Sequence, residues 1–168
     1  GLMSRFNVEC VCTTDDPIDD LTYHKQVKES GFQIHMLPAW RPDKAMNIDK
    51  AGFADYVQTL GEKAGVNIVH FKDMVDALQK RHDYFNACGC RLSDHGIDEF
   101  YDEPYTASQI EPIFSKAMRG MSLSALEIRQ FKHCFLTLSA EMDAADDWTQ
   151  QFHYGPIRNN NTRMFNAI

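Results

Sequence analysis

The apolar and polar positions of this chain follow two patterns, one typical of buried strands and one typical of amphipathic helices. Short, mostly apolar runs bounded by turn residues predict four strands, at residues 6–12, 32–37, 88–92 and 148–154. Longer stretches with apolar residues three and four positions apart predict helices, at residues 18–29, 49–64 and 71–87. Strands that alternate with helices favour a parallel α/β sheet with right-handed crossovers.

Two further helices are predicted from their first residues. Thr106 and Ser124 are followed three residues later by Gln109 and Glu127, which is the capping-box pattern. These helices should run to about residues 119 and 145, where their apolar spacing ends. The pair is longer than a plain crossover needs, so we treat 1–168 as a single domain and 104–146 as a helical subdomain within it.

Each predicted strand is followed by a polar segment, at residues 13–17, 40–44, 93–96 and 153–155. The carboxyl ends of parallel strands meet at one edge of a sheet, where catalytic side chains sit in α/β proteins. Pro38 and Pro42 predict an irregular loop over residues 38–42. Residues 93–96 are expected to form a tight turn after the third strand, with Gly96 supplying the bend.

The turn at 93–96 carries the first pair of catalytic candidates. His95 is of the residue type that serves as a general acid or base, or as a metal ligand, near neutral pH. It is equally of the type that binds backbone in a turn. Asp94 either orients the His95 ring or caps the turn. The flanking polar residues favour the catalytic interpretation of both residues.

The other strand ends carry candidates for substrate binding. Arg41 presents a fork suited to a carboxylate, although an internal ion pair with Asp43 is an equal alternative. Trp40, which precedes it, is included among the substrate-binding candidates. His153 and Arg158 stand beside a run of three asparagines, a set suited to a ligand with many hydroxyl groups or to an asparagine-rich turn.

Composition narrows the class of protein. The 168 residues carry a net charge of −7 and show no cluster of Lys and Arg, which argues against a nucleic-acid partner. No apolar run approaches the ~20 residues of a membrane span, and no signal region begins the chain. We therefore expect a cytoplasmic protein with no membrane partner.

The cysteines support a further alternative. Two Cys-x-Cys pairs, Cys10 with Cys12 and Cys88 with Cys90, could together form a four-thiolate zinc site in an interaction module. The spacing is shorter than in most structural zinc sites. Alternation along a strand would place both sulfur atoms of a pair on one face, so apolar packing explains the pairs equally well.

Four segments, taken in order, resemble the uronate isomerase (glucuronate isomerase) family. They are 11–17 (VCTTDDP), 40–44 (WRPDK), 89–96 (GCRLSDHG) and 151–165 (QFHYGPIRNNNTRMF). The resemblance implies a distorted (β/α)8 barrel of the amidohydrolase type, of which this chain would be a partial, helix-rich TIM-type barrel of about four strands. It implies aldose–ketose isomerisation of D-glucuronate and D-galacturonate in hexuronate catabolism. It also implies that Arg41 contacts the substrate, that His95 belongs to the active site, and that His153 and Arg158 line the pocket.

Two features of the family have no counterpart here. The sequence contains no His-x-His pair, which the family uses to bind a metal, and it lacks the family's C-terminal aspartate segment. The chain thus resembles the middle portion of the enzyme, and alone we expect it to be inactive, with no certain cofactor. The resemblance implies a divalent metal such as zinc for the full enzyme only. A non-catalytic domain that binds sugar acids is an alternative.

A partial barrel also leaves strands unpaired. The two outer strands of an open sheet present unsatisfied backbone groups, which must be covered by helices or paired with another chain. We therefore expect a homo-oligomer, with a hexuronate as the small-molecule partner implied by the resemblance.

Overall fold

Four parallel strands form the centre of the molecule. The computed structural model describes residues 1–155 and 161–165. Within them, the sheet follows the chain order, in which each strand pairs with the next: β1 (Cys10–Asp15), β2 (His35–Trp40), β3 (Leu92–Ile97) and β4 (Thr149–Tyr154). This arrangement confirms the predicted α/β class and matches four consecutive strands of a (β/α)8 barrel.

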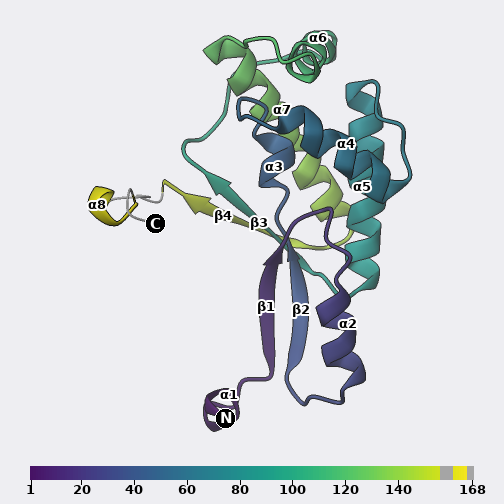
Figure 1. Cartoon of the computed structure of the whole chain (residues 1–168), viewed down its shortest axis with the longest axis vertical. Helices are drawn as coiled ribbons and strands as arrows, with labels where there is room; N and C mark the ends of the chain where they lie inside the picture. The colour runs from purple at the N-terminus through teal and green to yellow at the C-terminus, as the bar shows by residue number, and fades with distance from the viewer. Residues whose placement is uncertain (156–160, 166–168) are drawn as a thin grey trace.

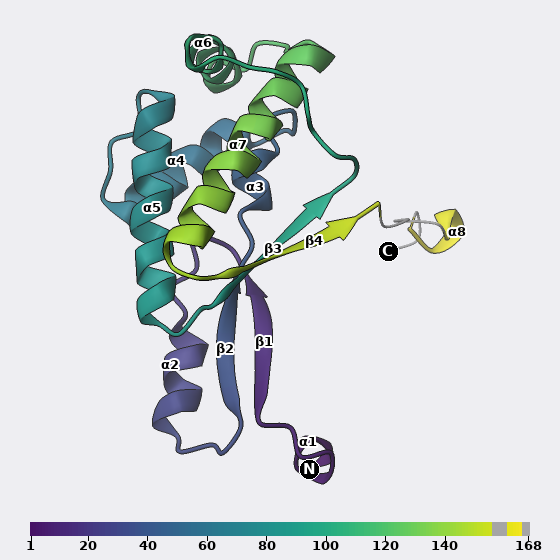
Figure 2. The same cartoon turned by 180° about the vertical axis from the view of Figure 1, so that it is seen from behind.

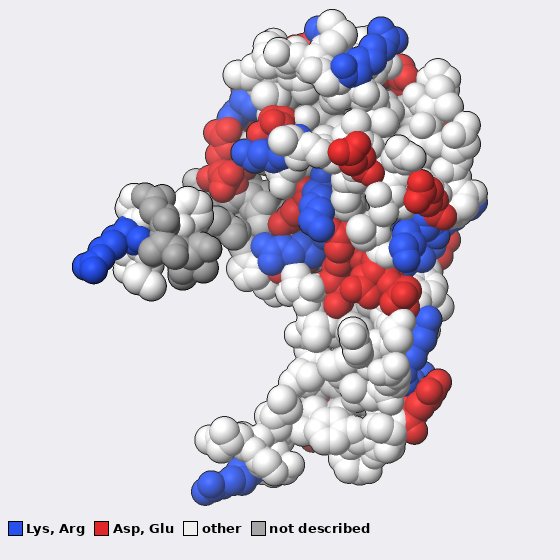
Figure 3. All heavy atoms as spheres, in the orientation of Figure 1, with Lys and Arg blue, Asp and Glu red and all other residues white. Residues whose placement is uncertain are grey.

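The helices that connect the strands lie together on one side of the sheet. Their bounds are α2 (Thr22–Glu29), α3 (Asp43–Met46), α4 (Phe53–Ala64), α5 (Phe71–Ala87), α6 (Ala107–Met118) and α7 (Ala125–Ala145). Two short helices, α1 (Leu2–Arg5) and α8 (Thr162–Phe165), lie before β1 and after β4. Both ribbon views place α2 to α7 on the same side of the strands (Figure 1 and Figure 2). The opposite side of the molecule is hollowed (Figure 3). No helix in the described part of the chain is long and apolar enough to cross a membrane.

The helix starts that were predicted from capping boxes are confirmed. The Thr106 backbone N–H donates to Gln109 Oε1 at 2.8 Å at the start of α6. At the start of α7, Ser124 N–H donates to Glu127 Oε2 at 2.8 Å and Glu127 N–H donates to Ser124 Oγ at 3.2 Å. The bond that Glu127 accepts from Lys116, together with this cap, lowers the pKa of Glu127 to about 2. Helix α5 also has the predicted bounds, 71–87.

The prediction of a loop from residue 38 onward was wrong, because β2 continues through Pro38 to Trp40. His35 N–H donates to the carbonyl of Glu9, just before β1, and Arg41 N–H donates to that of Asp15 at the end of β1, so the odd-numbered amides of β2 face β1. The ring nitrogen of Pro38 therefore faces the other way. On that side β2 is paired with β3 only between Trp40 and Ser93, so the missing N–H of Pro38 breaks no ladder bond.

The turn predicted at residues 93–96 was also wrong. These residues lie inside β3, and the chain turns earlier, just after α5, where Gly89 has a φ of +98°. A side chain at Gly89 would be strained in this conformation, and a Cβ there would lie 3.1 Å from Leu37 Cδ2. The polar residues Ser93, Asp94 and His95 are buried in the strand.

Other elements also differ from the prediction. Strand β1 begins at Cys10 and includes Thr13 to Asp15, whereas the prediction placed it at 6–12. Helix α2 begins at Thr22 instead of residue 18, after Leu21 adopts a left-handed conformation with φ of 55°. Helix α3 was not predicted. Its first residue, Asp43, becomes important at the candidate site.

The hydrophobic core lies between the sheet and the helices. Phe131 of α7 is fully buried, and its ring meets Phe53 of α4 and Phe71 of α5 edge to face at 6.1 and 5.5 Å. Phe114 of α6 also packs on Phe53 and Phe71. The helices of region 104–146 therefore share one core with α4 and α5. The subdomain itself stays a prediction.

Candidate active site

A buried carboxylate, Asp94, lies at the centre of the candidate site. It is in the middle of β3, and its side chain is 5% exposed. His153 Nδ1 lies 2.6 Å from Asp94 Oδ1, and Arg41 Nη1 lies 3.5 Å from Asp94 Oδ2. Gln151 Nε2 also donates to Asp94 Oδ1, at 3.4 Å. One carboxylate of β3 thus connects a histidine and an amide of β4 with an arginine that follows β2.

The strand register explains why these side chains meet. In the β3–β4 pair, Asp94 is opposite Gln151 and Gly96 is opposite His153. Paired residues of neighbouring strands point to the same face, so Asp94 and His153 share one face of the sheet. Arg41 follows β2 directly and reaches Asp94 from the other side. Three of the predicted site residues, Arg41, Asp94 and His153, are therefore brought together.

Asp43 is a part of the site that the sequence placed only as a possible partner of Arg41. Arg41 Nε donates to Asp43 Oδ2 at 2.8 Å, so the ion pair considered as an alternative does form. The Gly96 backbone N–H donates to the same carboxylate, at 3.1 Å to Oδ1. Asp43 thereby fixes the Arg41 side chain and ties the end of β2 to β3. The spacing of Arg41 and Asp43 was the only sequence signal for this role.

Arg41 keeps its charge despite partial burial. Burial opposes the positive charge, but the hydrogen bond to Asp43 and the charges of Asp43 and Asp94 raise the pKa of Arg41 above its ordinary value. Its side chain is 28% exposed, and within residues 1–155 and 161–165 its Nη2 atom makes no hydrogen bond. Part of the guanidinium can therefore reach a ligand carboxylate from solvent.

His95 lies on the other face of the sheet. Its neighbour Ser93, two residues away on the same face of β3, donates to Asp143 Oδ2 of α7 at 2.6 Å, which marks this face as the helix-covered one. The His95 ring is fully buried and lies 5.6 Å from the Phe152 ring. Burial lowers the pKa of His95, so the ring is neutral at pH 7. The structure does not bring His95 together with Arg41 and His153.

The two remaining candidates do not join the cluster. Trp40 is 2% exposed and packs edge to face on Phe85 and His82, so it belongs to the core beneath the sheet. A substrate-binding role for Trp40 has no support from this position. Arg158 lies outside the described residues.

The cysteines do not form the four-thiolate site considered from the sequence. In the described part of the chain, the His, Cys, Asp and Glu ligand atoms that gather in a group of three belong to His82, Asp83 and Asp146, with no cysteine among them. Cys10 and Cys12 are exposed on β1, whereas Cys90 is buried. The two sulfur atoms on β1 are close enough to interact, and burial together with Cys10 raises the pKa of Cys12.

The geometry of the Arg41, Asp94 and His153 cluster suits acid–base chemistry on an anionic ligand. A carboxylate bonded to Nδ1 holds an imidazole in one tautomer, with Nε2 as the nitrogen that exchanges a proton. In His153 this Nε2 has a long contact, 3.4 Å, with Gln151 Nε2, which a ligand would have to displace. The His153 side chain is 51% exposed, so a ligand can reach it. A fixed arginine beside this pair supplies the contact that a ligand carboxylate needs.

Comparison with known proteins identifies the family. The family model for glucuronate isomerase matches residues 1–168, which is the whole chain. The chain belongs to the glucuronate isomerase family. Among curated members, it is 57% identical to the uronate isomerase of Bacteroides thetaiotaomicron over 169 residues. It is 55% identical to that of Phocaeicola vulgatus over 169 residues and 48% identical to that of Cellvibrio japonicus over 170 residues.

Solved structures of family members have the same fold. The uronate isomerase of Thermotoga maritima superposes with a TM-score of 0.92 at 33% sequence identity, covering 99% of this chain and 37% of that one. The glucuronate isomerase of Caulobacter crescentus gives a TM-score of 0.86 at 27% identity, covering 98% and 34%. The three curated relatives are matched over 100% of this chain, which spans 36% of their length.

Proposed function

We propose that this chain contributes an acid–base and carboxylate-binding part of a uronate isomerase active site. The observation that carries the proposal is the contact of Asp94, within β3, with Arg41 at the end of β2 and His153 near the end of β4. The reaction is the aldose–ketose isomerisation of a hexuronate such as D-glucuronate or D-galacturonate, to D-fructuronate or D-tagaturonate. Family membership supports this choice of reaction over other acid–base chemistry.

In this proposal each residue has a distinct role. Arg41 binds the substrate carboxylate through the part of its guanidinium that Asp43 does not occupy. His153 accepts a proton at Nε2 from one carbon and returns it to the neighbouring carbon, while the proton of the adjacent hydroxyl passes to the former carbonyl oxygen, as aldose–ketose isomerisation requires. Asp94 orients His153 and stabilises the imidazolium that forms in between. Binding of the anion by Arg41 also holds the reacting carbons near His153.

A chimeric enzyme tests this function. The 169-residue stretch of the B. thetaiotaomicron uronate isomerase that matches this chain would be replaced by the chain itself. We expect the chimera to isomerise glucuronate within ~10-fold of the parent enzyme, because sequence this similar preserves the site. The Arg41→Lys chimera should raise KM by about 10-fold or more, since lysine cannot make the two-point contact. Initial rates of ketose formation measure both effects.

The parent enzyme and the 168-residue chain alone serve as controls. We expect no turnover by the chain alone, because the relatives carry residues beyond the stretch that it matches. A chimera that folds, as judged by circular dichroism, but shows no isomerase activity would refute the proposed role. An Arg41→Lys chimera with unchanged KM would refute the assignment of the carboxylate contact.

We also propose that the chain associates with copies of itself. Strands β1 and β4 are the outer strands of an open sheet. Phe152 and Tyr154 of β4 are 39% and 59% exposed. Unpaired strand edges with exposed aromatic residues favour pairing with another chain. Sedimentation velocity should therefore show a dimer or larger species at micromolar concentration, and a monomer over the whole concentration range would contradict this.

We propose a cytoplasmic location for the protein. All five cysteines are free in the structure, and free thiols persist in reducing compartments. Fractionation of cells that express the protein is the direct check, and recovery in an exported fraction would exclude it.

A further inference from the structure

A buried histidine of α5 lies in a polar network that the proposed function does not use. His82 is fully buried, and its ring stacks on Trp148 with the ring centroids 3.8 Å apart. His82 Nε2 lies 3.1 Å from Asp143 Oδ1. The other oxygen of Asp143 accepts the hydrogen bond from Ser93. Because a carboxylate only accepts, Nε2 carries the proton in this contact.

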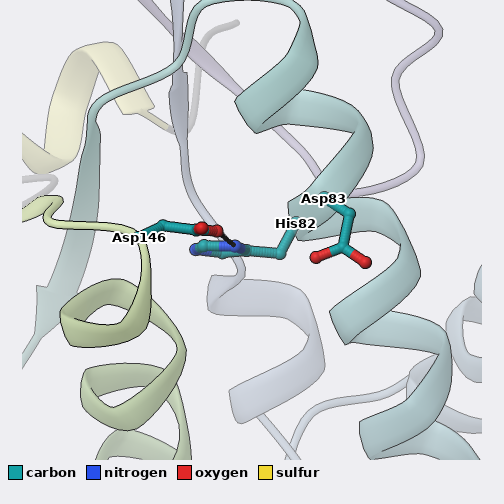
Figure 4. Close-up of side chains that lie close together, drawn as sticks. All are labelled: His82, Asp83 and Asp146. Atoms are coloured by element: carbon teal, nitrogen blue, oxygen red, sulfur yellow. Dashed lines mark ion pairs between the residues drawn. The ribbon is translucent and has the colours of Figure 1, made fainter.

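The other ring nitrogen has no such partner. His82 Nδ1 lies 3.2 Å from Asp146 Oδ2, within the range of an ion pair, but among the described residues Nδ1 makes no hydrogen bond of acceptable geometry. Asp83, the next residue of α5, brings a second carboxylate to the same place. The ligand atoms of His82, Asp83 and Asp146 all lie within 4.8 Å of one another (Figure 4).

This arrangement needs a positive charge. With the proton on Nε2, the lone pair of Nδ1 faces a carboxylate oxygen, and two electron-rich atoms repel each other unless a cation lies between them. A second proton on the ring would satisfy the charge, but the poor hydrogen-bond geometry at Nδ1 favours a different cation. A metal ion requires only that its ligand atoms surround it at the correct distance.

The separation of His82 Nδ1 and Asp146 Oδ2 suits a small divalent ion. His82 Nδ1 and Asp146 Oδ2 are 3.2 Å apart. With a zinc ion about 2.0–2.1 Å from each, the Nδ1–Zn–Oδ2 angle would be about 100–105°, which is near tetrahedral. The hydrogen bond from Nε2 to Asp143 is the second contact that metal-binding histidines usually make. Asp83 is exposed and the Asp146 side chain is 29% exposed, so an ion can enter from solvent.

We propose that His82, Asp83 and Asp146 form a binding site for a divalent first-row transition metal such as Zn²⁺. One imidazole nitrogen with two carboxylates is a donor set that zinc accepts, and water completes the coordination. The site joins α5 to the turn between α7 and β4. It is separate from the Arg41, Asp94 and His153 cluster, whose residues contribute none of its ligands.

Zinc titration of the chain by isothermal calorimetry tests the proposal. The chain would carry Cys10→Ser and Cys12→Ser, so that exposed thiols do not compete for the metal. We expect one ion per chain, and a rise of Kd by ~10-fold or more for Asp83→Asn and for Asp146→Asn, as expected for the loss of a ligand. Asp76→Asn is the matched control, because Asp76 is an exposed acid of α5 that pairs with Lys72 and should leave Kd unchanged.

A second measurement does not depend on the stability of the variants. Cobalt(II) in place of zinc should give visible absorption bands of a low-coordinate site in the chain, and Asp83→Asn should remove them. Asp83 is exposed and contacts Gln79, so this variant keeps the fold. Failure to bind zinc at 100 equivalents would overturn the site. So would binding that both aspartate variants retain, or binding that Asp76→Asn weakens as much.

Discussion

Replacing Asp94 by asparagine in the B. thetaiotaomicron chimera is expected to lower kcat/KM for glucuronate by at least ~100-fold, which corresponds to about 2.7 kcal/mol of transition-state stabilisation. Asparagine has the same shape, so the strand can keep its packing. It cannot stabilise the imidazolium of His153, however, and its amide can turn N–H towards Nδ1 and impose the other tautomer. It also removes a negative charge that faces Arg41. Steady-state rates measure the effect.

Asp55→Asn in the same chimera is the matched control. Asp55 is an exposed aspartate of α4, so the same chemical change there should leave kcat/KM unaltered. A pH–rate profile separates an acid–base role of Asp94 from a purely structural one, because only the former shifts the profile. An Asp94→Asn chimera with activity within threefold of the unmodified chimera would show that Asp94 has no such role.

The largest effect on stability is expected at Phe131. Its ring is fully buried and contacts Phe53, Phe71 and Phe135. Phe131→Ala removes most of this buried area and leaves a cavity among rigid rings, so we expect the free energy of unfolding to fall by about 3–5 kcal/mol. Because small domains are stable by only about 5–15 kcal/mol, this variant should be close to unfolding at 37 °C. Urea denaturation followed by circular dichroism measures the change.

Phe32→Ala provides the comparison for the same substitution outside the core. Phe32 is 57% exposed, so its truncation should cost about 0.5 kcal/mol or less. Equal losses at the two positions would mean that the four helices α4 to α7 do not share the core described above.

The helices were predicted more accurately than the strands, because the contacts that start them join residues close together in the sequence. The capping boxes at Ser124 and Thr106 involve residues three positions apart, so the sequence contains both partners. By contrast, the polar residues of β3 are held by distant ones. Ser93 binds Asp143, 50 residues away, and Gly96 binds Asp43, 53 residues away. Because the sequence does not show which distant residues bind Ser93 and Gly96, the polar run that contains them was predicted as a turn.

The same limit applies to the candidate site. Polar residues at strand ends correctly indicated that Arg41, Asp94 and His153 would meet, because parallel strands end at one edge. The strand was placed too early, however, so His95 was expected beside Asp94 in a turn. Inside β3, consecutive residues point to opposite faces, and this separates His95 from Asp94. Trp40 was lost from the site for a similar reason, since β2 continues through Pro38 and turns Trp40 towards the core.

The single residue pair between β2 and β3 has a mechanical consequence. The sheet consists of two well-paired halves, β1 with β2 and β3 with β4, that meet at Trp40 and Ser93. Arg41 belongs to one half, whereas Asp94 and His153 belong to the other. A small rotation of one half against the other therefore changes the gap between Arg41 and Asp94 without breaking a ladder elsewhere. Asp43 accepts hydrogen bonds from Arg41 of one half and from the Gly96 backbone N–H of the other, so its side chain opposes such a rotation.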